Sequence, residues 1–423
     1  MIVILPKGEA INMQWMDKSK KKIYYSLCII ILIYIGFYLI INLSNRPSTD
    51  DHQDKLIQSR GINVKLYGAK GDGHSDDTEA LKAAFNSNSG DLYFPKGIYK
   101  VTSTINVAPG KPKHVSGEDN VVISAKLEEN KNLFELRRNI SFKNLTFDFN
   151  NGSLNYGLFF KENLGKISLS NLVFKNIKDL NSSSSTIIVY ILTPGNRFQI
   201  KNIDFTHIKK KGNGIYGDGG GNITCLYITD SGNGSGAIGQ VKGIKIKNVH
   251  NIDPSNNIIY EDSSGIYIIT GKNDRKNDIK LDNIYGYNFG KRLIKLHASN
   301  IKVNHVFAYS DTNDAVSAIG VNSGLQPGEK VNTIITNVTI RGRFSAALAT
   351  AGEHTTFRNI DIKIQKPTLI NNDFHSYGVL ITGENATIEK AVIKAERPIF
   401  SIDNNGKLTD SVRIKNTKIE TIE

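Results

Sequence analysis

The chain has 423 residues, of which 39% are hydrophobic and 22% are charged, and its formal net charge is +13. It contains 57 Ile and 45 Asn, together about a quarter of all residues. So much Ile excludes a disordered chain, and so much Asn excludes a helical bundle. Ordinary contents of Gly, Leu, Glu and Cys exclude collagen-like, coiled-coil and disulfide-scaffold proteins. Because Ile favours strands and Asn favours turns, the composition indicates an elongated all-β repeat.

Residues 23–43 form an uncharged, strongly apolar run. At ~1.5 Å rise per residue, a helix of this length spans the ~30 Å hydrocarbon layer of a membrane. A cleavable signal peptide has a shorter apolar core of ~7–15 residues, followed by small residues at its cleavage site, which residues 42–47 do not provide. We therefore expect one uncleaved transmembrane helix. A cleaved signal peptide and a buried core strand are the alternatives.

The charges around this run predict its orientation. Four lysines lie between residues 18 and 22, and the segment after the run is close to neutral. The positive-inside rule then places residues 1–22 in the cytoplasm and the rest of the chain outside the cell. Residues 44–60 are polar and show no periodicity, so they are interpreted as a tether to a domain over residues 61–423.

The part of the chain after the run is basic. Residues 1–44 contain five Lys, one Glu and one Asp, so residues 45–423 carry +10 of the net charge. A basic surface favours anionic partners such as uronic-acid polysaccharides or phosphate-rich wall polymers. A general excess of Lys on a solvated surface explains the charge equally well. We expect no nucleic-acid partner, because the extracellular domain has no recognisable nucleic-acid-binding motif.

One phrase recurs from residue 139 onward: two alternating apolar residues, an Asn, then two more alternating apolar residues. Alternation is typical of strands, and the Asn indicates a bend between two of them. Units of this kind stack as the coils of a solenoid, with their inward side chains forming one core. A long interval before the fourth copy is expected to hide a degenerate coil at residues 223–230. The predicted bend residues, which would align as a ladder, are Asn144, Asn171, Asn202, Asn248, Asn283, His305, Asn337, Asn359, Lys390 and Asn416.

The segment from Ile62 to Ile105 precedes these repeats and reads INVKLYGAKGDGHSDDTEALKAAFNSNSGDLYFPKGIYKVTSTI. It resembles the first segment of the pectate-lyase-like superfamily of right-handed parallel β-helix proteins. The resemblance implies a right-handed parallel β-helix over residues 61–423, with residues 61–105 as a cap and first strands. The shared elements are Asn63-Val64, Tyr67-Gly68-Ala69, Gly71-Asp72-Gly73, Asp76-Asp77-Thr78 and Phe94 to Tyr99.

A short capping helix is predicted within this segment. Asp76 would be its N-cap and Glu79 would complete a capping box. The apolar stripe between Ala80 and Phe85 would cover the first coil, whose open end otherwise invites edge-to-edge pairing. Asp76 and Asp77 are therefore interpreted as structural rather than catalytic.

The strand KRLIKLH at residues 291–297 breaks the apolar pattern of the corresponding strands in other coils. Lys295 and His297 share one parity and are expected on the outer face, with Arg292 where the strand begins. The neighbouring coils add Glu261, Asp262 and Tyr267 before this strand, and Asp311 and Asp314 after it. Elimination from a uronate polymer needs cations beside the carboxylate and a base for the α-proton. We therefore assign Arg292 and Lys295 to charge neutralisation and His297 to the base. A solvated basic strand is the alternative.

Other candidate sites are weaker. Asp311 and Asp314 would supply the acid and base of a glycoside hydrolase, although Asp is also common in plain turns. The polygalacturonase-like pattern is incomplete, because residues 413–415 match only Arg-Ile-Lys, within the last repeat, and Gly-His-Gly does not occur. The nine His show no metal-ligand spacing, so no cofactor is expected. Calcium held by Asp and Asn oxygens of adjacent coils stays open.

The resemblance implies carbohydrate-active proteins (lyases, hydrolases and epimerases), phage tailspikes and non-catalytic proteins, so it does not define the reaction. We expect a single-pass membrane protein whose extracellular β-helix acts on an anionic polysaccharide by β-elimination or glycoside hydrolysis. The alternative is a non-catalytic surface protein that binds polysaccharide or cell wall. The sequence indicates neither the sugar nor the oligomeric state.

Overall fold

The chain divides into two compact units, Met1–Ser59 and Arg60–Glu423. The first contains the antiparallel strands β1 (Ile2–Ile4) and β2 (Ala10–Asn12). The predicted anchor at residues 23–43 lies outside the described residues, and none of the helices that are described is long and apolar enough to span a bilayer. The computed structural model describes residues 2–4, 10–12, 61–88, 90–161, 164–192, 197–212, 221–230, 236–252, 263–270, 277–312, 315–321, 331–366, 375–402 and 412–422.

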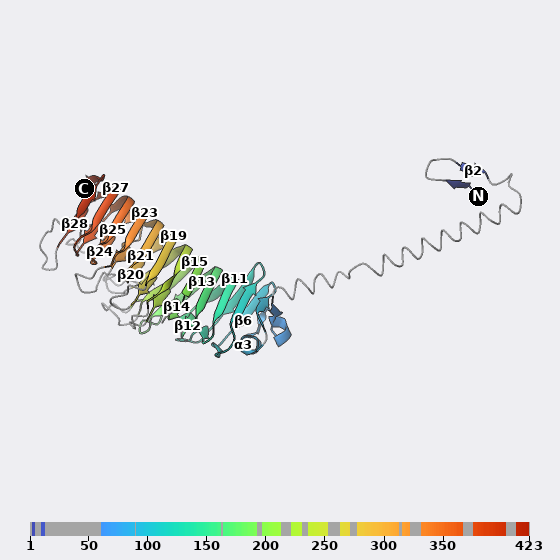
Figure 1. Cartoon of the computed structure of the whole chain (residues 1–423). Helices are drawn as coiled ribbons and strands as arrows, with labels where there is room; N and C mark the ends of the chain where they lie inside the picture. The colour runs from blue at the N-terminus through green and yellow to red at the C-terminus, as the bar shows by residue number, and fades with distance from the viewer. Residues whose placement is uncertain are drawn as a thin grey trace. The chain divides into compact units, whose positions relative to one another are not determined.

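The second unit is the predicted parallel β-helix, in which each coil adds one strand to each of two sheets (Figure 1). One sheet, here called the flat sheet, has eleven strands that pair in chain order. They are β7 (Ile105–Val107), β10 (Phe134–Leu136), β12 (Tyr156–Phe160), β14 (Thr186–Leu192), β16 (Ile223–Thr229), β18 (Ser264–Ile269), β20 (Lys291–His297), β22 (Ala315–Val321), β24 (Ala346–Thr350), β26 (Tyr377–Ile381) and β28 (Arg397–Ser401).

The other sheet, here called the bent sheet, consists mainly of long strands that turn near their middle. They are β11 (Ile140–Gly152), β13 (Lys166–Asp179), β15 (Arg197–Lys211), β17 (Ile238–Ile252), β19 (Asp278–Phe289), β21 (Ile301–Ser310), β23 (Ile334–Arg343), β25 (Thr356–Gln365) and β27 (Thr387–Ala395). Shorter strands complete its two ends. They are β3 (Ile62–Asn63), β4 (Asp72–Asp76), β5 (Leu92–Phe94), β6 (Gly97–Val101), β8 (Lys113–Gly117), β9 (Val121–Ala125), β29 (Arg413–Lys415) and β30 (Lys418–Thr421).

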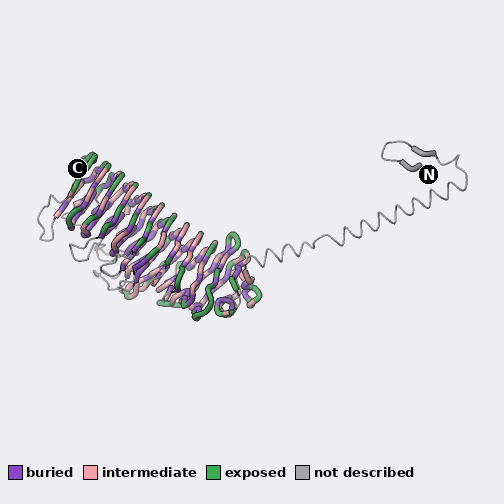
Figure 2. Tube along the Cα trace, in the orientation of Figure 1, coloured by how far each residue is buried: buried purple, intermediate pink, exposed green. Residues whose placement is uncertain are grey.

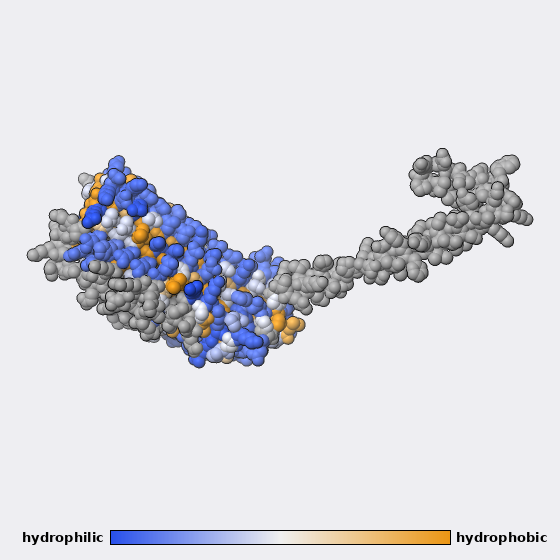
Figure 3. All heavy atoms as spheres, in the orientation of Figure 1, coloured by the Kyte–Doolittle hydropathy of each residue, from blue (hydrophilic) through white to orange (hydrophobic). Residues whose placement is uncertain are grey.

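Inward and outward side chains alternate along the strands, so buried and exposed positions alternate along the trace in Figure 2. The inward residues are mainly Ile, Val, Leu and Phe and form one continuous core. Equivalent residues of successive coils stack directly on one another. The rings of Phe147 and Phe174 are 4.8 Å apart, and those of Phe174 and Phe205 are 5.3 Å apart. The outer surface in Figure 3 is mostly hydrophilic, with small separate apolar patches.

Each long strand bends at a residue in the left-handed backbone region, which Asn adopts more readily than most non-glycine residues. Nine of the ten predicted bend residues occupy this position, with φ between 49° and 58°. Their side chains form the predicted ladder in places. Asn171 Nδ2 donates to Asn144 Oδ1 at 2.9 Å, Asn202 to Asn171 at 3.0 Å, and Asn359 to Asn337 at 3.0 Å.

The prediction is wrong for β17, where Gly243 (φ 68°) occupies the bend in place of Asn248. Asn248 lies five residues further along the strand, in register with Asn288 at a second left-handed position (φ 54° and 48°). Apolar residues alternate between Gly243 and Asn248, so the recurring sequence pattern matches at either position. Because the recurring pattern predicts a bend at Asn, it indicates Asn248 and not Gly243.

The extra coil expected at residues 223–230 is also absent. This segment contains β16, which pairs with β14 and β18 in the flat sheet, and β15 pairs directly with β17. The long interval therefore belongs to a single coil.

A capping helix, α3 (Thr78–Asn86), follows the 3₁₀ turn η2 (Val64–Tyr67), and Leu81 and Phe85 of α3 are fully buried in the core. The N-cap position is held by Asp77 instead of Asp76. The Asp77 carboxylate accepts hydrogen bonds from two backbone N–H groups of the preceding loop, and Asp76 accepts from the N–H and hydroxyl of the first helical residue. Glu79 pairs with the lysine three residues on, so no capping box forms. Both aspartates therefore have structural contacts, as interpreted from the sequence.

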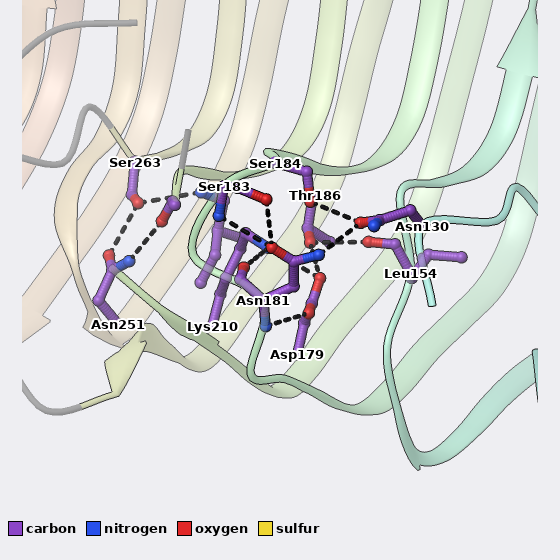
Figure 4. A network of polar contacts seen from close by, with 12 residues as sticks. Asn130, Leu154, Asp179, Asn181, Ser183, Ser184, Thr186, Lys210, Asn251 and Ser263 are labelled. Atoms are coloured by element: carbon purple, nitrogen blue, oxygen red, sulfur yellow. Dashed lines mark hydrogen bonds and ion pairs between the residues drawn. The ribbon is translucent and has the colours of Figure 1, made fainter. Parts of the chain in front are cut away.

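A buried ion pair lies at the corner between the bent and flat sheets (Figure 4). Lys210 Nζ is 2.8 Å from Asp179 Oδ2, and both side chains are almost completely buried. Burial lowers the pKa of Lys210, while the hydrogen bond to Asp179 opposes this shift. Thr186 donates its hydroxyl to the same carboxylate oxygen, and in the next coil Asn251 occupies the register position of Lys210. Because its members satisfy one another, we interpret this network as structural.

Replacing Asn171 by Ala should lower the free energy of unfolding by about 2–5 kcal/mol. The change removes two ladder hydrogen bonds, at ~0.5–1.5 kcal/mol each, and places Ala in the left-handed region at ~1–2 kcal/mol. Asn171→Gly loses the bonds without the strain and should cost less. Urea denaturation of both variants measures the difference, and a Gly variant as stable as the parent would contradict a stabilising ladder.

Replacing Lys210 by Met should cost about 3–5 kcal/mol, because the Asp179 carboxylate would stay buried without its counter-ion. The double variant Asp179→Leu/Lys210→Met removes both charges and should recover much of this loss. Thermal and urea unfolding of the two variants provide the comparison. A double variant less stable than Lys210→Met alone would refute the explanation.

Candidate functional site

The outer face of the flat sheet carries a row of aromatic side chains at one register position. Phe159, Tyr190, Tyr227 and Tyr267 follow one another through the paired strands β12, β14, β16 and β18. Their successive ring centroids are 4.8, 5.0 and 5.0 Å apart. In β20 the same position holds Lys295, whose Nζ lies 4.4 Å from the centre of the Tyr267 ring. The row therefore changes from aromatic to cationic at β20, where a cation–π contact joins the two parts.

His297 is the next outward residue of β20 and contacts the same tyrosine. Its Nδ1 lies 3.2 Å from the Tyr267 hydroxyl, and the two rings meet edge to face at 5.4 Å. Ile294 and Leu296 are fully buried in the core, and so is Leu293, although it shares the parity of Lys295 and His297. Tyr267, Lys295 and His297 together are here called the tyrosine–lysine–histidine cluster.

This cluster lies in a largely dehydrated part of the outer surface. The exposed fraction is 4% for Lys295 and 7% for His297. Two coils away, burial together with the neighbouring Tyr227 and Tyr156 raises the pKa of Tyr190 to about 12. Charges and hydrogen bonds act more strongly in such surroundings than in water.

The structure separates the other predicted site residues from His297. Arg292 lies on the same strand, half-buried and in register with Ser264 of β18. Asp311 is exposed in the turn before β22, and its N–H donates to Asn288 Oδ1 at 3.2 Å. The first residue of β22 pairs with Lys291, the first residue of β20, so Asp311 lies near that end of β20. His297 is the last residue of β20. At ~3.3 Å per residue, the two ends of this strand are roughly 20 Å apart. Asp314 lies outside the described residues.

The cluster combines groups that can move a proton and hold a negative charge. The phenol and imidazole share a hydrogen bond, so a proton can pass between them, and the Lys295 ammonium lies 4.4 Å from the centre of the phenol ring. Within the described stretches, no three His, Cys, Asp or Glu side chains gather as metal ligands would.

Sequence reasoning missed the aromatic row. Tyr190, Tyr227 and Tyr267 each lie in a flat-sheet strand with a β-branched or Leu residue on both sides. This pattern, Val-Tyr-Ile, Leu-Tyr-Ile and Ile-Tyr-Ile, is a signal that could have revealed the row. It identifies the row only after the strands have been placed in register, because the intervals between them are unequal.

Comparisons with known proteins match the first part of the β-helix domain. Residues 61–114 match the model of a family described as rhamnogalacturonase A/epimerase, pectate lyase-like. The preneck appendage protein of Bacillus phage PZA is 34% identical over 113 residues, which are 25% of this chain and 13% of the phage protein. The chain thus spans only a small part of that relative.

Two similar solved structures have lower identity but wider coverage. The A-module of a mannuronan C-5 epimerase from Azotobacter vinelandii is 15% identical with a TM-score of 0.45, over 86% of this chain and 100% of that one. A surface adhesin of Streptococcus pneumoniae is 15% identical with a TM-score of 0.49, over 86% and 92%. The match at residues 61–114 confirms the resemblance seen from Ile62 to Ile105: this segment is similar to the pectate-lyase-like rhamnogalacturonase A/epimerase family.

Proposed function

We propose that this protein is an extracellular polysaccharide lyase that acts on a uronate-containing polymer lying across the flat sheet. The tyrosine–lysine–histidine cluster carries the proposal, because Tyr267 lies within 3.2 Å of His297 and directly beneath the Lys295 ammonium. Two further observations support an anionic carbohydrate. Residues 45–423 carry a charge of +10, and residues 61–114 match a pectate-lyase-like family.

The proposed reaction is a β-elimination. His297 removes the proton from C5 of the uronate, and Lys295 neutralises the charge that develops on its carboxylate. The electron pair forms a C4–C5 double bond as the bond from C4 to the glycosidic oxygen breaks. The Tyr267 phenol donates a proton to the departing oxygen. The 3.2 Å hydrogen bond then returns the proton from His297 to Tyr267.

A second candidate function, polysaccharide binding without turnover, is favoured by the low exposure of the cluster. Because Lys295 is 4% and His297 7% exposed, catalysis requires a local opening of the outer surface. Binding alone does not require one. A hydrolase based on Asp311 has less support, because this carboxylate lies far from the cluster along β20.

Turnover can be tested with the full chain, purified in a mild detergent and incubated with polygalacturonate or alginate. The ultraviolet absorbance of the unsaturated uronate product should rise. His297→Ala and Tyr267→Phe should each lower this rate by ~100-fold or more, since each removes a proton-transfer group. His114→Ala, an exposed histidine on β8, is the matched control and should keep the parent rate.

The other outcomes separate the alternatives. New reducing ends without ultraviolet absorbance would reject elimination in favour of hydrolysis. Polymer binding without either product, unchanged in His297→Ala, would reject turnover and support the binding function.

We also propose that residues 23–43 anchor the protein with its β-helix outside the cell, from the apolar run and the lysines before it. Protease added to intact cells should then degrade an epitope at the C-terminus and spare one at the N-terminus. Both epitopes should be lost after the cells are opened. Protection of the C-terminal epitope in intact cells would contradict this orientation.

A further inference from the structure

The ladder of bend residues is interrupted in the middle of the bent sheet. Asn202 is followed in register by Gly243, which has no side chain to continue the ladder. Two coils later the bend residue is His305. Its Nδ1 lies 2.9 Å from Asp282 Oδ1, so its side chain contacts the residue before the bend of the preceding coil and does not join the bend ladder. The coil between these two has Asn283 at its bend.

Asn283 therefore has the conformation of a ladder residue without ladder bonds. It is exposed, and its side chain makes no hydrogen bond with the part of the chain that the structure describes. Asn359, with the same φ of 55°, donates to Asn337 at 3.0 Å. The amide of Asn283 is thus available to a ligand, whereas the equivalent amide of Asn359 is used internally.

An open groove of about 510 Å³ lies at this interruption. Tyr285 and Phe307 form its floor, with ring centroids 5.1 Å apart and planes inclined by 10°. Tyr285 is 40% exposed, so its ring is accessible to a ligand in this groove. Asn283 and His305 border the groove, so an apolar floor lies beside a few hydrogen-bonding groups. Ligand pockets of ~300–1,000 Å³ commonly have this composition.

We propose that this groove is a glycan-binding subsite, separate from the tyrosine–lysine–histidine cluster of the flat sheet. A pyranose ring has apolar C–H faces and hydroxyl groups around its edge. One face would pack on Tyr285 and Phe307, while its hydroxyls would exchange hydrogen bonds with Asn283 and His305. The proposal goes beyond the proposed lyase function, because it requires binding and no chemistry at this place.

The surrounding charges favour an acidic sugar. Lys245 lines the groove with 64% of its side chain exposed, and its nearest described carboxylate, Asp204, is 3.8 Å away. The next outward row continues the surface, with Tyr287 and Tyr309 stacked at 5.1 Å and Lys247 5.9 Å from the Tyr287 ring. A chain of uronate residues would thus meet aromatic rings and cations in succession.

The same charges disfavour a second copy of this chain as the occupant. Each copy carries a net charge of +13, so two basic surfaces would repel each other. On this part of the bent sheet the described outward rows carry seven cations and four carboxylates. The cations are Lys175, Lys245, Lys247, Arg341, Lys363, Lys394 and Lys418, and the carboxylates are Asp148, Asp204, Asp361 and Glu420.

The test measures the affinity of the full chain for oligogalacturonides by calorimetry. All variants carry His297→Ala, so that cleavage does not intervene and the result is independent of the lyase proposal. Tyr285→Ala/Phe307→Ala should weaken binding at least tenfold. Asn283→Ala should weaken it severalfold, whereas the matched Asn359→Ala should keep the affinity and lose stability through its ladder bond. A neutral β-1,3-glucan oligosaccharide should bind more weakly than the oligogalacturonide.

Gly243→Asn provides an independent variant that adds a side chain. A Cβ there would lie 2.6 Å from Asn202 Oδ1, so the Asn202 amide must rotate, and the new amide should enter the groove. Binding should fall at least tenfold in a protein that still unfolds cooperatively. Unchanged affinity in the Tyr285/Phe307 or Gly243 variants would overturn the proposal. So would a dimer of the parent that these substitutions dissociate, because a second copy would then occupy the groove.

Discussion

The structure depends on one constraint: every coil must bend where its neighbours bend. A parallel strand can pair with the strands on both sides only if its left-handed residue lies in register with theirs. Ten successive bends satisfy this condition, eight with Asn or Gly and two with His305 and Lys390. Once the bends are aligned, every outward position is aligned too, so equivalent side chains stand about 5 Å apart from coil to coil.

This constraint explains how much of the fold could be predicted. The alternation and the recurring Asn predicted the parallel β-helix and nine of its ten bends, because backbone conformation and burial are local properties of each strand. The error at Asn248 arose where a coil has two left-handed positions and the first is a glycine. The start of α3 was predicted one residue early, because Asp76 and Asp77 are equally good capping residues by type.

The candidate site was less accessible to sequence reasoning. Parity along β20 predicts that Lys295 and His297 share one face, because it concerns a single strand. The contact of both with Tyr267 and the distance from Asp311 to His297 depend on pairing between coils separated by unequal loops. The low exposure of the cluster also depends on packing that no local pattern reports. The catalytic roles of these residues stay predictions.

Gly243 has a consequence for how such a protein acquires new surfaces. In a fold of nearly equivalent coils, many bend side chains hydrogen-bond to the bend side chains of neighbouring coils. A binding site can therefore form where one coil has no side chain at its bend. Because Gly243 has no side-chain amide, its neighbour in β19 has no ladder partner on that side. Each bend along the solenoid is in this sense a latent site, opened by one substitution, while the register of the remaining coils preserves the fold.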